Sequence, residues 1–175
     1  AEEVKKRTNG GVRFRFYPGG VLGDEAVILR RMKVGQIQMA GFTGVGLGEI
    51  LPEARLLELP FIYESYAEVD FVRERIRPEI ARRLLNKGFV LLGWNDTGFI
   101  HLYSRAPLAT LEQFRGTKVW VWEGDPLAHS YYSSAGIKPT PLALPDVLTS
   151  LQTGLVDTVY NSPLGLISLQ WQTKV

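Results

Sequence analysis

The segment Gly136–Pro163 constrains the fold more than any other part of this chain. Within it, Pro145–Asp146 predicts the start of a helix and Gly154 predicts its end. An extended apolar run follows, and it ends in the polar pair Tyr160–Asn161. Polar groups at the end of a buried strand are where α/β proteins tend to hold ligands. The segment therefore predicts a helix, a buried strand and a candidate binding edge in one continuous unit.

The rest of the chain alternates between strand patterns and helix patterns. Extended or alternating apolar runs predict strands at Val12–Phe16, Ile37–Met39, Phe89–Trp94, Phe99–Tyr103 and Lys118–Trp122. Helical spacing and capping residues predict helices at residues 1–7, 24–34, 53–58, 67–86, 111–114, 125–136 and 164–175. Asp24 and Asp125 are expected to open two of these helices, and Gly35 and Gly136 to end them. Pro78 is expected to break or kink the helix that contains it. Strands that alternate with helices indicate an α/β fold with a largely parallel sheet.

Composition limits the classes of function. A chain of 175 residues with 45% hydrophobic content can bury a sizeable core, as one large or two small domains. The formal net charge is +2, and basic and acidic residues are mixed along the predicted helices, so we expect no nucleic-acid partner. Cysteine is absent, which excludes disulfides, thiolate catalysis and cysteine-ligated zinc. No apolar run approaches the roughly 20 residues of a membrane span.

The sequence contains no evident catalytic constellation. The glycines of Gly44–Gly48 are spaced Gly-x-Gly-x-Gly, which is not the dinucleotide fingerprint, and the run is predicted to be a flexible loop. His101 and His129 lack partners at metal-site spacing, and Ser130 lies outside any nucleophile elbow. An enzyme would need a titratable pair in a cleft, and Glu123 has no evident partner. We therefore expect that the protein is not an enzyme and that it binds neither a cofactor nor a metal ion.

Several motifs occur in the order found in one known family. They are Val12–Asp24 (VRFRFYPGGVLGD), Glu58–Phe61 (ELPF), Phe114–Val119 (FRGTKV) and Gly136–Pro163. Together they resemble the solute-binding subunits of TRAP transporters, the tripartite ATP-independent periplasmic systems, of the dicarboxylate- and sialic-acid-binding type. The resemblance spans nearly the whole chain. It implies a type II periplasmic-binding-protein-like fold, with two α/β lobes of mostly parallel sheets joined by crossover strands.

The resemblance also implies a domain plan and a role. The first lobe is expected at residues 1–96, the crossover or hinge strand at 97–104 and the second lobe at 105–175. In the family a signal peptide and a first strand precede the region matched here, and return strands and a long helix follow it. The chain is therefore expected to be an internal portion of a periplasmic protein. Such a protein captures a small organic solute by hinge closure and delivers it to membrane permease subunits.

Two departures from the family pattern affect the expected ligand. The family arginine of a Lys-Ile-Arg-Val strand corresponds to Trp120 here, and the arginine of a Gly-Phe-Arg element corresponds to Ile100. Arginine forks bind carboxylates bidentately, so both changes remove an anion clamp. The resemblance with these changes favours an organic acid with an aromatic or indole-like body. Its carboxylate would need a backbone N–H, a residue outside this chain, or an arginine that the motifs do not mark.

The candidate binding residues come mostly from positions that match the family. They are Trp120, Asn161, Thr43, Glu123, Tyr160, Ile100, Phe99, Phe42 and Trp94. Strand alternation places Trp120 on one face with Trp122, for which a buried core is the alternative. Because the matching family position points to the ligand, we expect Trp120 to line the binding pocket. Glu123 is either a cleft carboxylate or an exposed loop residue, and the last three candidates fit a core equally well. A ligand-sensing or interaction module on the same fold is the alternative function.

Overall fold

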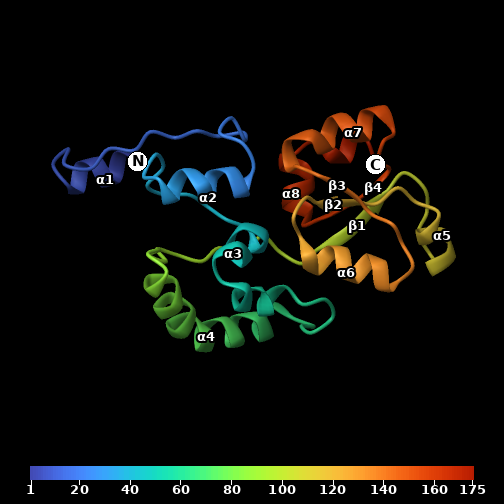
Figure 1. Cartoon of the computed structure of the whole chain (residues 1–175), viewed down its shortest axis with the longest axis horizontal. Coiled ribbons are helices and arrows are strands. Elements are labelled where there is room, and N and C mark those ends of the chain that lie inside the picture. Colours follow the sequence, from blue (N-terminus) through green and yellow to red (C-terminus); the bar gives the residue numbers. More distant parts are fainter.

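The computed structural model describes residues 1–175, which form two groups of elements joined by an extended segment (Figure 1). The terms first lobe and second lobe refer to the predicted residues 1–96 and 105–175. The first lobe contains α1 (Glu2–Arg7), α2 (Glu25–Lys33), α3 (Gly44–Ile50), the 3-10 helix η1 (Pro52–Glu58) and α4 (Tyr66–Asn86). None of the helices combines the length and apolar composition that crossing a bilayer requires.

The second lobe and the strand that leads into it alternate strands with helices. In chain order they are β1 (His101–Ser104), α5 (Leu111–Arg115), β2 (Trp120–Trp122), α6 (Pro126–Ser134), β3 (Thr140–Leu142), η2 (Leu144–Asp146), α7 (Val147–Thr153), β4 (Thr158–Asn161), α8 (Pro163–Ser168) and η3 (Trp171–Thr173). This alternation confirms the predicted α/β class.

The strands of the second lobe lie in the order β1-β4-β2-β3. β1 pairs antiparallel with β4, and β2 pairs parallel with β3. A single parallel bridge between Val119 and Thr158 joins the two pairs. β3 was not among the predicted strands. Pro141 at its centre cannot donate a ladder hydrogen bond, but β3 lies at the sheet edge, where proline is tolerated.

The strands predicted in the first lobe are not formed as hydrogen-bonded strands. Residues 12–16, 37–39 and 89–94 have no β-ladder partner, although apolar residues alternate in the first two segments and run continuously in the third. Val12, Phe14 and Phe16 are exposed. An alternating pattern divides side chains between two faces, but a strand also needs a second backbone at hydrogen-bonding distance. The prediction of three strands in these segments is therefore wrong for this structure.

The glycine run of the first lobe is a helix rather than the predicted loop. Thr43 caps α3, since its Oγ1 accepts a hydrogen bond from the Val45 N–H at 3.2 Å. A Cβ at Gly46 would lie 2.4 Å from the Phe42 ring and 2.5 Å from Glu25 Oε2, and one at Gly48 would lie 2.6 Å from Arg55. These glycines therefore allow close packing within a helix, and do not serve chain flexibility.

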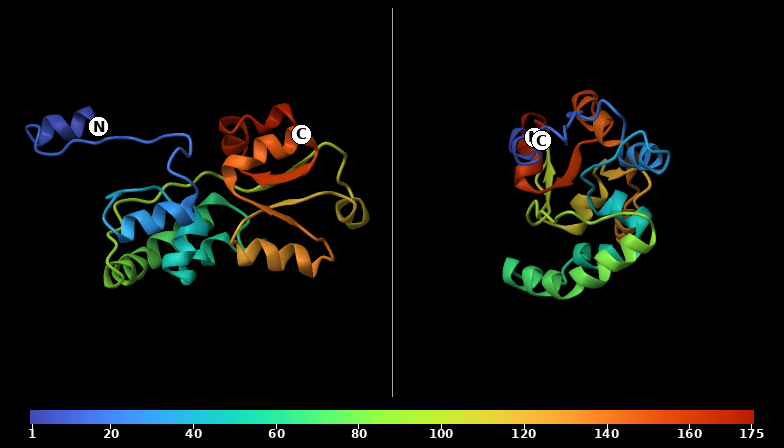
Figure 2. Two further views of the ribbon diagram at one scale, coloured as in Figure 1. Left: turned by 45° about the horizontal axis from the view of Figure 1, so that its top comes forward. Right: turned by 90° about the vertical axis from the view of Figure 1, so that its left-hand side faces the viewer.

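Two other helices differ from the prediction. α4 continues through Pro78 for 21 residues, and Figure 2 shows it curved along its length, which is the usual response to a proline ring in a helix. The predicted helix 164–175 is interrupted at Gln170, whose φ of 60° is left-handed, so it becomes α8 and η3. Helix ends predicted from Asp24, Asp125 and Gly154 are confirmed.

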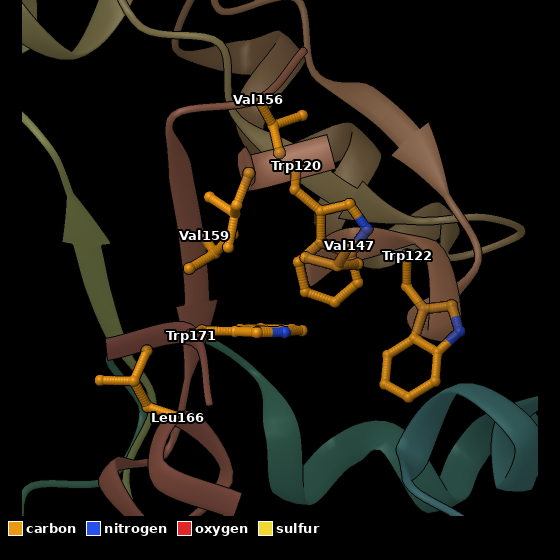
Figure 3. Close-up of a cluster of buried hydrophobic side chains, with 8 residues drawn as sticks. Trp120, Trp122, Val147, Val156, Val159, Leu166 and Trp171 are labelled. Atoms are coloured by element: carbon orange, nitrogen blue, oxygen red, sulfur yellow. The ribbon is translucent and has the colours of Figure 1, made fainter. Parts of the chain in front are cut away.

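Each lobe has its own hydrophobic core. The first-lobe core packs α2, α3, η1 and α4 around Leu29, Ile50 and Leu84. In the second lobe, Trp120 and Trp122 belong to one cluster, and Val119 and Val121 belong to another on the opposite side of β2. This division confirms the predicted alternation along β2. Figure 3 shows the first cluster, in which the Trp120 indole lies between those of Trp122 and Trp171.

Candidate functional site

The carboxyl end of β2 faces the amino end of α2 across the lobe interface. The Trp122 indole Nε1–H donates a hydrogen bond to Asp24 Oδ2 at 2.8 Å, and the Leu144 backbone N–H approaches the same oxygen at 3.4 Å. The other oxygen of Asp24 accepts a hydrogen bond from the Glu25 N–H at 2.8 Å, which caps α2. One carboxylate thus caps a first-lobe helix and binds the second lobe.

A buried ion pair joins the lobes beside this contact. Arg55 in η1 donates from both terminal nitrogens to Asp125, at 2.5 Å and 3.3 Å, and its Nε donates to Glu58 at 3.1 Å. The side chains of Arg55 and Asp125 are only 14% and 3% exposed. Burial would lower the pKa of the Arg55 guanidinium, but its hydrogen bonds and charge interactions with the two carboxylates outweigh that and raise it.

Asp125 is also the N-cap of α6. Its Oδ1 accepts hydrogen bonds from the backbone N–H groups of Leu127 and Ala128, at 3.0 Å and 3.2 Å. Because a carboxylate has several acceptor sites, Asp125 can cap its helix and hold Arg55 together. The sequence pattern of Asp125 followed by Pro126 reveals only the cap.

A second carboxylate secures the start of α3 on the first-lobe side. Glu25 accepts hydrogen bonds from the Thr43 N–H at 2.9 Å, the Thr43 hydroxyl at 3.0 Å and the Gly46 N–H at 2.7 Å. Burial raises the pKa of Glu25 above its ordinary value of 4.5, although these hydrogen bonds oppose the shift. Val45 of α3 packs against the core cluster of the second lobe. The start of α3, with Thr43 exposed, therefore belongs to the lobe interface.

An aromatic stack lies behind the carboxyl ends of β2 and β4. Trp120 stacks on Tyr160 with 4.9 Å between ring centroids, and Trp171 meets Trp120 edge-on at 5.3 Å. The Trp120 Nε1–H donates to the Leu142 carbonyl at 3.1 Å, and Trp120 is 1% exposed. The structure therefore places Trp120 in the core. A contact between Trp120 and a ligand stays a prediction, and it requires the ring to be uncovered.

Tyr160 and Asn161 end β4 at the lobe interface. The Tyr160 hydroxyl accepts a hydrogen bond from the Trp122 backbone N–H at 3.4 Å, and burial raises the pKa of this phenol. Asn161 is half-buried, and its Oδ1 accepts a hydrogen bond from the Ser162 N–H at 2.8 Å. Its amide N–H₂ group donates no hydrogen bond within the chain, so it can donate to a ligand.

The remaining predicted residues are dispersed. Ile100 is 55% exposed, and Phe99 contacts Tyr66 with 4.7 Å between ring centroids. Glu123 is exposed on the loop after β2. Phe42 and Trp94 pack against the first-lobe core. Whether any of these residues contacts a ligand stays a prediction.

The most extensively bonded interface residues are ones that the motifs did not mark as site residues. They are Asp24, Glu25, Arg55, Trp122 and Asp125. The two aspartates carried a sequence signal only as helix caps, and Arg55 lay inside a predicted helix. Arg55 and Asp125 are 70 residues apart in sequence, and no local pattern connects them. No group of three or more His, Cys, Asp or Glu side chains is arranged to hold a metal ion.

A polar cavity of about 540 Å³ lies at the opposite end of the second-lobe sheet, by the amino ends of β2 and β4. Arg105 and Lys118 line it, and they donate hydrogen bonds to the carbonyls of Leu151 and Gly154. Cations that bind the last carbonyls of a helix are typical C-terminal caps, here of α7. The main charged groups of this cavity thus have a structural role.

Comparisons with known proteins agree on one family. Residues 1–170 match the family described as "Bacterial extracellular solute-binding protein, family 7". A solute-binding protein of Chromohalobacter salexigens is 32% identical over 93% of this chain and 48% of its own length. The chain spans about half the length of the curated relatives it matches.

Solved structures show the same fold. A TRAP periplasmic solute-binding protein of Chromohalobacter salexigens, with bound D-glucuronate, has a TM-score of 0.89 and 30% identity, covering 99% of this chain and 58% of that one. One from Xanthobacter autotrophicus Py2, with bound β-D-galacturonate, has a TM-score of 0.92 and 25% identity over 99% of this chain and 58% of that one. The structural likeness therefore extends through both lobes.

Proposed function

The chain belongs to the bacterial extracellular solute-binding proteins of family 7, and from this membership we propose that it is part of the periplasmic solute-binding subunit of a TRAP transporter. The full protein captures a small organic acid between its two lobes and delivers it to the membrane permease. The observation that carries the proposal is the arrangement at the interface. At the carboxyl end of β2, Trp122 binds Asp24 at the amino end of α2, and Val45 near the amino end of α3 packs against the core cluster to which β4 contributes. Ligands of α/β proteins tend to bind at such strand ends.

Three predicted residues give the site its polar contacts in this proposal. Asn161 has a free amide donor at the end of β4, Tyr160 lies beside it, and Thr43 is exposed at the start of α3. A carboxylate held by neutral donors needs several of them, because each charge-assisted hydrogen bond contributes only about 1.5–3 kcal/mol. The organic acid is therefore expected to carry hydroxyl or carbonyl groups as well as its carboxylate.

The preference for an aromatic body loses its main support. It was expected because Trp120 replaces the family arginine, but Tyr160 and Trp171 already pack against its ring and it is 1% exposed. We therefore retain a small organic acid as the proposed ligand and no longer expect it to carry an aromatic ring. Arg55 is the arginine at the interface that the motifs did not mark, but Asp125 and Glu58 already neutralise its charge.

The test uses the full-length mature protein in a thermal-shift screen. The probes are D-glucuronate, succinate and an aromatic acid, with an amine and an uncharged sugar alcohol as controls. A ligand at 100 times its Kd stabilises the folded state by about 2.7 kcal/mol, so binding of an acid must raise the Tm. If only the amine or the sugar alcohol raises the Tm, or if no probe does, the proposal is wrong.

Two variants test the site itself. Asn161→Ala is expected to weaken acid binding about 10-fold or more, because a hydrogen bond to a charged group is lost. Asn95→Ala, at an exposed position outside the site, is the matched control and should bind as the native protein does. Ile100→Arg should strengthen binding of simple carboxylates, since Ile100 is 55% exposed and can accept a charge. Native affinities in both site variants would place the site elsewhere.

A further inference from the structure

Two aspartates account for all hydrogen bonds and ion pairs found between the first lobe and the second lobe. Asp24 accepts hydrogen bonds from Trp122 and Leu144, and Asp125 accepts them from Arg55. We propose that Asp24 and Asp125 form a two-point latch that holds the lobes closed. This inference rests on the proposed function, and it assigns a role to residues that do not themselves bind the solute.

The latch has the same design in both lobes. Asp24 caps α2 in the first lobe and reaches the second lobe with its other oxygen. Asp125 caps α6 in the second lobe and accepts a hydrogen bond from Arg55 of the first lobe. Each carboxylate is therefore held in place by its own helix before the lobes meet. A side chain that is already positioned loses little conformational freedom when it gains a partner, which favours a contact that forms and breaks repeatedly.

The contacts are also suited to opening. Asp24 and Asp125 keep their capping hydrogen bonds when the lobes separate, and the released oxygens become accessible to water. Arg55 retains Glu58, which lies three residues away in the same lobe. No charge is left buried without a partner in the open state, so opening avoids the large penalty of an unpaired buried ion. The latch therefore stabilises closure without preventing opening.

Closure by this latch does not require the solute, because the chain itself supplies both sides of each contact. The latch therefore sets the ratio of closed to open molecules before any ligand binds, and a bound ligand shifts that ratio further toward the closed state. A solute that binds only the closed state has an apparent affinity proportional to the fraction of closed molecules. Weakening the latch should thus lower the affinity for any solute by the same factor.

The test separates the charge of Asp125 from its capping role. Asp125→Asn keeps a good N-cap residue and removes the charge that binds Arg55. Trp122→Phe keeps an aromatic ring and removes the N–H that binds Asp24. Glu112→Gln is the matched control, because it removes one negative charge from the second-lobe surface at a side chain that is 79% exposed.

The measurement is the distribution of distances between the lobes in the full-length protein without any added solute. Spin labels at Lys87 and Ser134, both exposed, report it by pulsed electron resonance. The native protein is expected to show a closed population, and each latch variant should lower the closed-to-open ratio about 10-fold, as loss of about 1.4 kcal/mol implies. Glu112→Gln should match the native distribution.

Two outcomes would overturn the latch. One is a native protein that shows only the open distance, and the other is latch variants with the native distribution. If Asp125→Asn does not fold, Arg55→Gln tests the same pair from the first lobe. Because no solute is added, failure of the acid-binding proposal leaves this result unaffected.

Discussion

Replacement of Gly46 by alanine tests whether the glycines of α3 serve packing. In an exposed helix, glycine to alanine stabilises by about 1 kcal/mol, because alanine has the higher helix propensity. At Gly46 the new Cβ would lie 2.4 Å from the Phe42 ring and 2.5 Å from Glu25 Oε2. Neither neighbour can move freely, since Phe42 packs against the first-lobe core and Glu25 accepts several hydrogen bonds.

For Gly46→Ala, the stability lost by overpacking is expected to exceed the stability gained from the higher helix propensity of alanine. Overpacking a core costs about 1–3 kcal/mol, and displacing Glu25 weakens its charged hydrogen bond from the Gly46 N–H, worth about 1.5–3 kcal/mol. Against a gain of about 1 kcal/mol, the free energy of unfolding should fall by about 2 kcal/mol or more. In a domain of about 150–250 residues that lowers the Tm by at least about 4 °C, and in a protein twice that size by about half as much.

The assay is thermal and urea denaturation of the full-length protein. Gly41→Ala is the control, because a Cβ at Gly41 meets nothing within 4 Å and the residue has no positive φ. It should leave stability unchanged or raise it by up to about 1 kcal/mol. If Gly46→Ala is as stable as Gly41→Ala or more so, the packing explanation for α3 is refuted and the run tolerates larger residues.

Two further predictions concern Glu25 and the second-lobe core. Because burial raises the pKa of Glu25 in the folded state, the stability from this group is fully present below its unfolded pKa of about 4.5 and is lost as the pH rises through the folded pKa. Glu25→Gln should remove that decline, as measured by urea unfolding at a series of pH values above the unfolded pKa. A Glu25→Gln variant with the native pH slope would show that Glu25 titrates normally. Leu151→Ala removes a side chain with 0% exposure from the cluster that contains Trp120, and should cost about 2–5 kcal/mol by urea denaturation, while Leu164→Ala, at a 62% exposed residue, should cost much less. Equal losses in the two leucine variants would contradict the assignment of this core.

The local structure of most helices could be predicted from the sequence. Asp24 and Asp125 were recognised as N-caps, and Gly35, Gly136 and Gly154 as stops, because these residues act on the backbone within one turn of themselves. The order of the motifs also led to the family, since a resemblance spread along the chain does not depend on any one contact.

The candidate site could be predicted only in part. Tyr160 and Asn161 do lie at the end of a strand, as the pattern indicated, because strand ends are read from local sequence. The burial of Trp120 could not be foreseen, since it depends on Trp171, which follows 51 residues later and whose helical run gave no sign of turning back over the sheet.

The sequence by itself determined the α/β class, the helix caps and the alternation along β2, because these depend on residues within a few positions of one another. Only the tertiary structure decided that Gly44–Ile50 is a helix, that Thr140–Leu142 pairs as an edge strand, and that Asp24 and Asp125 join the lobes. Each of these depends on partners that lie from 18 to 120 residues away. Such contacts form only when the whole chain has folded, and local patterns carry no information about which partners will meet.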